Sequence, residues 1–141
     1  MSPIVEITHR EEFSSAHRLF DPKLSEAENR RLYGICCRDH GHNYALEVTV
    51  AGNLPSSGMV MDLKALGTIV QERIISRVDH LHLNHDVPFL ADSIPTAEVL
   101  AVAFWGELER DLKAFPGCRL HRIRVYESRN NFVDYLGPTT A

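Results

Sequence analysis

The segment that decides the fold is His40-Gly41-His42-Asn43-Tyr44-Ala45-Leu46-Glu47-Val48-Thr49-Val50. Every second residue from Tyr44 to Val50 is apolar or aromatic, and this alternation is typical of a β-strand with one buried face. His40 and His42 run directly into the strand, two residues apart, so their imidazoles point to the same side. The segment therefore predicts a half-buried strand whose first residues could chelate one metal ion.

A second strand is expected near the N-terminus, over residues 4–8 and continuing to about residue 16. Phe13, Ser15 and His17 share one alternation parity, so His17 should face the same side as Phe13. His17 could then supply a third nitrogen ligand to His40 and His42. Three protein ligands with one open position are typical of a catalytic zinc site. The alternative is a surface turn at residues 40–42 and an ordinary half-buried His17.

Two helices are expected between residues 62 and 116. Asp62 can cap a helix that begins at Leu63 and ends near Asp79. Thr96 can cap a second helix that ends before Pro116-Gly117. The polar residues 21–31 should form a loop with a short helical turn. The first helix should bury one apolar stripe, which consists of Leu63, Leu66, Val70, Ile74 and Val78.

Near the C-terminus, residues 123–127 and 132–136 read as two strands joined by a hairpin turn at residues 128–131. The order of elements is thus strand, strand, helix, helix, strand, strand. The economical architecture is an α+β fold, with a four-stranded antiparallel sheet and two helices packed on one face. The length of 141 residues suits a single domain over residues 1–141.

Composition narrows the classes of function. The formal net charge of −4 without runs of like charge argues against non-specific binding to nucleic acid or membranes. No apolar stretch approaches the roughly 20 residues that cross a bilayer, and the N-terminus does not resemble a secretory signal. Three cysteines, two of them adjacent, argue against a disulfide framework. A cytoplasmic location is expected.

Cys36 and the Asp79-His80 pair are candidates for acid–base chemistry. Cys36 lies four residues before His40, where a nearby metal ion would favour its thiolate. It could act as a general base or be a small buried side chain, and Cys37 competes for the role on spacing alone. Asp79 could orient His80 and raise its proton affinity, although the pair could also be a helix C-terminal motif.

Two further features carry functional candidates. His82 and His85 extend the segment to DHLHLNHD, which by itself suggests a second metal site. Glu127 shares the parity of Ile123 and Val125 and should project to the same face. Its carboxylate could accept two hydrogen bonds from a ligand with paired N–H donors, or it could be a surface residue of the hairpin.

These residues together resemble the 6-pyruvoyl-tetrahydropterin synthase and 6-carboxytetrahydropterin synthase family. The resemblance covers nearly the whole chain in collinear order. It rests on six motifs, which are FSSAHRL, GICCRDHGHNY, GMVMDLKAL, VDHLHLN, PTAEVLA and VYESRNN.

The resemblance implies the tunnelling fold and a role for each candidate. It implies a zinc ion on His17, His40 and His42, with Cys36 as the base, Asp79 and His80 assisting proton transfer, Glu127 anchoring a pterin, and Thr96 lining the pterin pocket. It also implies a homohexamer, built as a dimer of trimers, with active sites between subunits. The implied substrate is 7,8-dihydroneopterin triphosphate.

The product stays open at this point. Three residues separate Cys36 from His40, a spacing that resembles bacterial queuosine-pathway enzymes, which make the 6-carboxy product. The segment LSEAENRRLYG resembles instead a loop of the pyruvoyl-type enzymes. Two other functions also remain. One is a zinc hydrolase that uses His40, His42 and the cluster from Asp79 to His85, without need of Cys36. The other is a non-catalytic module that binds a metal or a pterin.

Overall fold

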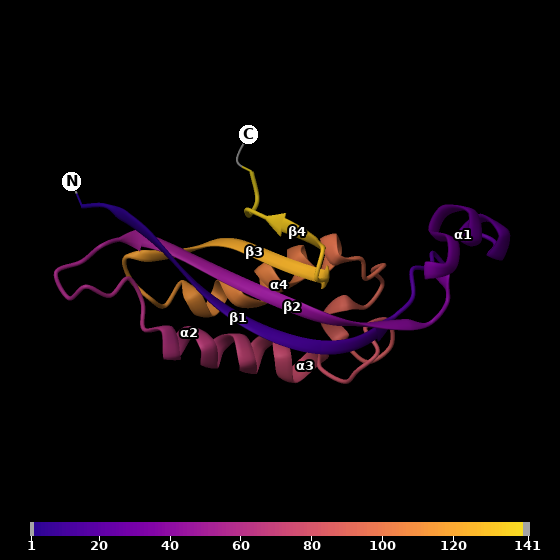
Figure 1. Ribbon diagram of the computed structural model, residues 1–141, viewed down its shortest axis with the longest axis horizontal. Helices are drawn as coiled ribbons and strands as arrows, with labels where there is room; N and C mark the ends of the chain where they lie inside the picture. Colours follow the sequence, from indigo (N-terminus) through magenta and orange to yellow (C-terminus); the bar gives the residue numbers. More distant parts are fainter. Residues whose placement is uncertain (1, 140–141) are drawn as a thin grey trace.

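The sheet of the computed structural model, which describes residues 2–139, has four antiparallel strands in the order β1-β2-β3-β4 (Figure 1). This confirms the expected α+β architecture. The first strand ends at His17, close to its predicted end, while the second extends beyond residues 44–50 in both directions, so that His40 and His42 lie within β2. The strands are β1 (Ile4–His17), β2 (His40–Asn53), β3 (Cys118–Ser128) and β4 (Asn131–Tyr135).

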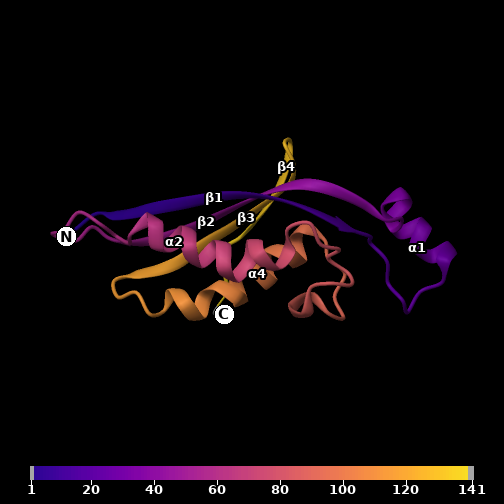
Figure 2. The ribbon, with the colours of Figure 1, turned by 90° about the horizontal axis from the view of Figure 1, so that it is seen from below.

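Two helical elements cover one face of the sheet, as expected (Figure 2). One runs from α2 (Leu63–Val70) through a π-helical turn, η2 (Gln71–Ile75), into α3 (Ser76–Val78). The other is α4 (Ala97–Leu112). Asp62 caps α2 by accepting the N–H of Lys64, and Thr96 caps α4 by accepting the N–H of Val99. No helix among residues 2–139 is long and apolar enough to span a membrane.

The core forms where the apolar face of β2 meets the helices. The four alternating residues of β2 are fully buried, and so are four of the five stripe residues of the first helix. Leu63 was expected in that stripe, but it is 51% exposed because it lies in the first helical turn, at the rim of an open cleft beside His9. Burial of each such large apolar side chain contributes about 1.5 to 3 kcal/mol.

The expectation of a loop with a short helical turn at residues 21–31 is wrong in extent. The chain there forms α1 (Glu26–Tyr33), followed by a 3-10 turn, η1 (Gly34–Cys37). Ser25 and Glu28 form a reciprocal capping box, an N-terminal signal that the polar composition concealed. Both views place α1 beyond the end of the sheet, away from α2 and α4 (Figures 1 and 2).

The hairpin between β3 and β4 is tighter than expected. Ser128 pairs with Asn131, so the turn consists of Arg129 and Asn130 only. β3 therefore ends at Ser128 and β4 begins at Asn131, directly at the two sides of the turn.

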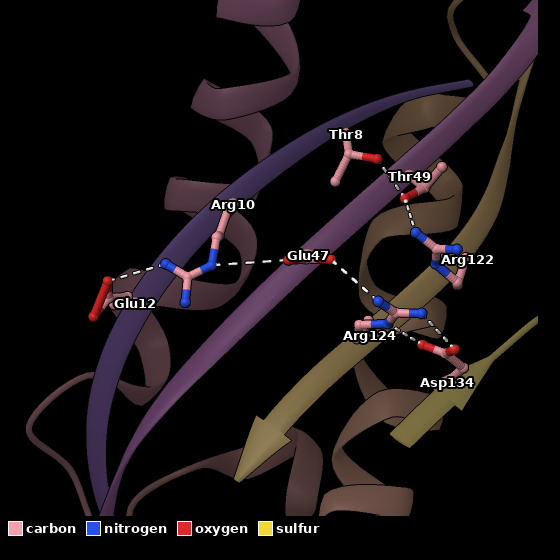
Figure 3. Close-up of polar contacts among 8 residues, drawn as sticks. All are labelled: Thr8, Arg10, Glu12, Glu47, Thr49, Arg122, Arg124 and Asp134. Carbon is pink, nitrogen blue, oxygen red and sulfur yellow. Dashed lines mark hydrogen bonds and ion pairs between the residues drawn. The ribbon is translucent and has the colours of Figure 1, made fainter. Parts of the chain in front are cut away.

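Charged and hydroxyl side chains cross the face of the sheet that the helices leave free (Figure 3). Arg10 contacts Glu12 and Glu47, at 3.1 and 3.8 Å. Arg124 lies 4.0 Å from Glu47 and makes two hydrogen bonds to Asp134, at 2.6 and 2.9 Å. The row joins all four strands with alternating charge, and it is consistent with only one pairing register.

Candidate metal centre

Three histidines converge where β1 ends and β2 begins. The antiparallel register pairs His17 with His40 and Ser15 with His42. The ring centroids of the three imidazoles lie 4.5, 5.2 and 5.0 Å apart, and one nitrogen from each ring lies within 4.8 Å of the other two. His17 is 1% exposed, in line with the alternating burial of Phe13, Ser15 and His17. The fold thus brings together the three residues that the sequence singled out as metal ligands.

Hydrogen bonds to backbone carbonyls orient two of the rings. His17 Nδ1 lies 2.8 Å from the carbonyl oxygen of Pro95, and His40 Nδ1 lies 2.7 Å from that of Arg38. A carbonyl oxygen only accepts, so each Nδ1 carries the proton and donates it. The Nε2 atom of each ring then has a free lone pair. In metal sites, hydrogen bonds from the other ring nitrogen fix the same tautomer.

The third ring has a buried nitrogen without a partner. His42 Nε2 is buried and has no hydrogen-bond partner within the described part of the chain. Such an atom normally costs free energy, and a metal ion would satisfy it. Three imidazole nitrogens that face one another fit a divalent cation of the zinc type, with room for further ligands.

Burial favours the neutral form of these rings. Burial is the main cause of the lowered pKa of His17. The hydrogen bond to the Pro95 carbonyl raises this pKa, and the neighbouring His40 and His42 lower it further. Burial likewise lowers the pKa of His42, although the carboxylate of Glu127 opposes it. A metal ion binds only the neutral imidazole, so the lowered pKa values of His17 and His42 favour metal binding.

Glu127 lies at the edge of the histidine group. Its Oε1 is 3.8 Å from His42 Nε2, and its side chain is 37% exposed. Glu127 therefore projects to the same face of the sheet as His42, as its alternation with Ile123 and Val125 predicted. A half-exposed carboxylate beside the histidines is available to a ligand.

Sequence reasoning missed two groups that contact His17. The hydroxyl of Tyr44 lies 3.4 to 3.5 Å from its ring nitrogens, and burial raises the pKa of Tyr44, so the phenol stays neutral. Tyr44 lies two residues after His42 in β2, so strand alternation alone could have placed it on the face of the histidines. The carbonyl of Pro95 is the other group, and it immediately precedes the capping residue Thr96. Thr96 is half-buried, and its hydroxyl caps α4, so the start of this helix lies beside the histidines.

Cys36 and Cys37 end the 3-10 turn η1 and are free, half-buried thiols. The carbonyl of Cys36 accepts the N–H of Leu19 at 2.8 Å, and that of Cys37 accepts from Arg18 Nε at 2.9 Å. These two bonds attach the cysteine turn to the chain that follows β1. The turn is therefore held close to His17 along the backbone, while no contact joins either thiol to the histidine rings among the described residues.

Asp79 and His80 form a pair, but they lie on the outer edge of β1. Asp79 Oδ2 is 3.0 Å from His80 Nδ1, and Asp79 Oδ1 accepts the N–H of Ser14 at 2.9 Å. The bond from Ser14 is the main cause that lowers the pKa of Asp79, and His80 adds to it. The His80 side chain is 82% exposed, and its φ is +63°. Within residues 2–139, no hydrogen bond or ion pair joins this pair to the three histidines, but His80 and His42 line the same open cleft.

The suggested second metal site is not assembled. The rings of His82 and His85 stack at 4.2 Å, and His82 Nε2 lies 3.0 Å from Asp39 Oδ1. His82 Nδ1 accepts the N–H of Asn84, so Nε2 carries the proton and donates to Asp39. Across the described residues, His17, His40 and His42 are the one group with metal-binding geometry.

Comparison with known proteins agrees with this geometry. The family model described as 6-pyruvoyl tetrahydropterin synthase matches residues 6–138. A 6-pyruvoyl tetrahydrobiopterin synthase of Dictyostelium discoideum is 42% identical over 138 residues, which cover 97% of this chain and 99% of that relative. The Homo sapiens protein of the same name is 42% identical over 135 residues, covering 94% and 91%. The structure of Caenorhabditis elegans 6-pyruvoyl tetrahydropterin synthase superposes with a TM-score of 0.88 at 34% identity, covering 97% and 98%.

Metal retention should require all three histidines. We expect His17→Ala, His40→Ala and His42→Ala each to weaken zinc binding by at least about 100-fold, more than the roughly 10- to 100-fold lost with an outer-sphere partner. Elemental analysis after dialysis against a chelator measures it. His121→Ala, whose ring pairs with Glu6, is the matched control and should keep its zinc. Full zinc content in any of the three variants would remove that residue from the site.

Proposed function

Because the chain belongs to the 6-pyruvoyl tetrahydropterin synthase family, we propose that it is a zinc-dependent lyase acting on 7,8-dihydroneopterin triphosphate. The convergence of three histidine nitrogens beside a half-exposed carboxylate is the observation that supports it. The product we propose is 6-pyruvoyl-tetrahydropterin, formed with elimination of triphosphate. The high identity to relatives named for this product favours it over 6-carboxytetrahydropterin, whose formation would also release acetaldehyde.

In the proposed mechanism, His17, His40 and His42 hold the zinc ion. When bound, zinc supplies Lewis acidity that makes protons on the substrate side chain easier to remove. Glu127 accepts the paired N–H donors of the pterin ring and fixes the ring. Thr96, at the start of α4, lines the pterin pocket.

Proton transfer is assigned to three side chains. The Cys36 thiolate removes a proton from the substrate side chain as general base. His80 returns a proton as general acid, and the carboxylate of Asp79 orients its ring. The Asp79–His80 contact at 3.0 Å supports this assignment.

The proposed active site lies between subunits of a homohexamer, a dimer of trimers. The ring of His80 supports this arrangement, because 82% of the side chain is exposed and available to another copy. The strand β4 and the part of β1 before Ser14 are sheet edges, which leave backbone groups available for pairing with another copy.

A mixing experiment tests the shared site. Cys36→Ala and His80→Ala should each lose most of the activity when prepared alone. Unfolding and refolding them together should restore part of the activity, because some sites then combine an intact Cys36 with an intact His80. The native mass should be that of six chains. A monomer, or no recovery from mixed subunits, would contradict the proposal.

The reaction itself is tested by incubating the zinc-loaded protein with 7,8-dihydroneopterin triphosphate. We expect triphosphate and 6-pyruvoyl-tetrahydropterin, identified by mass spectrometry. Cys36→Ala should lose about 100-fold or more in kcat, the scale of one general base, and keep its zinc. Cys37→Ala is the matched control and should stay active. Acetaldehyde in stoichiometric amounts would reassign the product, and an equal loss in both variants would reject Cys36 as the specific base.

Glu127→Gln should weaken pterin binding without loss of zinc. The substitution replaces one acceptor oxygen with a donor, so an N–H of the pterin faces an N–H of the protein. The cost should be about 1.5 to 3 kcal/mol, or roughly tenfold to a hundredfold in Kd. Calorimetric titration of a non-reactive pterin measures it. Glu12→Gln, at an exposed site on the other face of the sheet, is the control. Unchanged affinity in Glu127→Gln would make Glu127 an ordinary surface residue.

A further inference from the structure

Three arginines from separate segments line one cleft beside the cysteine turn. Arg18 follows β1, Arg30 lies in α1, and Arg38 precedes β2. The cleft has a volume of about 280 Å³, and its wall includes Cys37. Three separate elements within residues 18–38 thus bring three permanent positive charges to a single concavity at Cys37, the neighbour of the proposed base.

Arg18 is fixed in place without any carboxylate. Its Nε donates to the carbonyl of Cys37 at 2.9 Å, and its guanidinium carbon lies 4.0 Å from the ring centre of Phe20. A stacked guanidinium held through Nε presents its two terminal nitrogens in one plane. This pre-organisation lowers the entropy cost of binding an anion.

Arg30 and Arg38 have no ion pair and no side-chain hydrogen bond within residues 2–139. The helix that carries Arg30 is nevertheless well anchored. The neighbouring Asn29 is fully buried, accepts the N–H of Asp21 at 2.7 Å, and donates to the carbonyls of Asp21 and Ser25. The guanidinium groups of Arg30 and Arg38 are therefore free to bind a ligand, while the backbone that carries them is held by hydrogen bonds.

Two carboxylates also line the cleft, Glu26 and Asp39. Asp39 accepts a hydrogen bond from His82 Nε2 at 3.0 Å and keeps a negative charge that also acts on Arg18. Glu26 is the second counter-charge. Three arginines therefore outnumber the carboxylates, and an anion with several oxygens could accept from all three.

The order of the proposed binding groups matches the order of the parts of the proposed substrate. Glu127 lies beside His42, and His40, Asp39 and Arg38 follow in the direction of the cleft. Four extended residues from His42 to Arg38 span about 13 Å at roughly 3.3 Å per residue. The ring, the reacting side chain and the triphosphate of the proposed substrate follow one another in the same order.

We propose that Arg18, Arg30 and Arg38 bind a phosphate chain and, resting on the proposed function, that this chain is the triphosphate of the pterin substrate. Guanidinium groups match phosphate oxygens in geometry and keep their charge at every working pH. The arginines act in binding and take no part in proton transfer.

Calorimetric titration of inorganic triphosphate into the zinc-loaded protein tests the binding. Arg30→Gln and Arg38→Gln should each raise Kd about tenfold, the scale of one charge-assisted hydrogen bond. Arg31→Gln is the matched control, since it removes the same charge from the next residue of α1, outside this cleft. Zinc is measured before and after, because triphosphate also binds metal ions. Equal affinity in wild type, Arg30→Gln and Arg38→Gln would overturn the proposal.

Glu26→Gln should change the affinity for triphosphate in the opposite direction from the arginine substitutions. It removes one of the two counter-charges in the cleft, so triphosphate should bind severalfold more tightly. Weaker binding in this variant would contradict a cleft built for anions.

Kinetics separate the two parts of the proposal. With 7,8-dihydroneopterin triphosphate, Arg30→Gln and Arg38→Gln should raise KM about tenfold and leave kcat and zinc content nearly unchanged. An unchanged KM, with triphosphate binding still dependent on the arginines, would overturn the assignment to the substrate and leave a site for free phosphate chains. Arginine-dependent binding of triphosphate with no turnover of any pterin would keep the cleft and reject the proposed function.

Discussion

The pairing register of β1 with β2 is the constraint on which the rest of the structure depends. It places His17 opposite His40 and Ser15 opposite His42. Side chains alternate between the two faces of a strand, so a slip of one residue would turn His17 to the free face and leave the other two histidines behind. The same slip would expose Phe13, which stacks on Tyr44 with ring centres 4.8 Å apart. Burial of the core and assembly of the histidine group are therefore one requirement.

Contacts on both faces of the sheet secure this register. On the buried face, the bond from His17 to the carbonyl of Pro95 ties the end of β1 to the start of α4. On the free face, Arg10, Glu47 and Arg124 join the strands in a charged row (Figure 3). Each exposed ion pair contributes little by itself, but a shift of two residues in one direction would place Glu12 opposite Glu47. The polar face thus disfavours this wrong pairing as well as stabilising the right one.

The edge of β1 links the two halves of the proposed chemistry. His80 donates its N–H to the carbonyl of Ser14, and Leu83 donates to that of Ala16, so residues 79–83 run along the last part of this strand. The side of β1 that carries His17 faces α4, while the segment with Asp79 and His80 continues the sheet outward. His42 and His80 line one open cleft at this end of the sheet. The His80 side chain is 82% exposed there, and this exposure is the physical reason to propose that a second copy completes the site.

The sequence by itself determined the features that depend on local periodicity and capping. Alternation placed His17 on the face of Phe13, and Asp62 and Thr96 marked the starts of the two covering helices. The motifs also indicated the family, which the comparisons confirm. The polar segment at residues 21–31 was misjudged, because composition weighed more than the capping box at Ser25.

Only the tertiary structure decided which groups meet across long separations in the chain. It supplied the carbonyl of Pro95 to His17, brought His80 to the same open cleft as His42, and gathered Arg18, Arg30 and Arg38 around another. Local pattern reports the face on which a side chain lies, because that depends on the residue's own backbone angles. It does not report what lies opposite, because that depends on how separate elements pack, and packing is fixed by the whole chain.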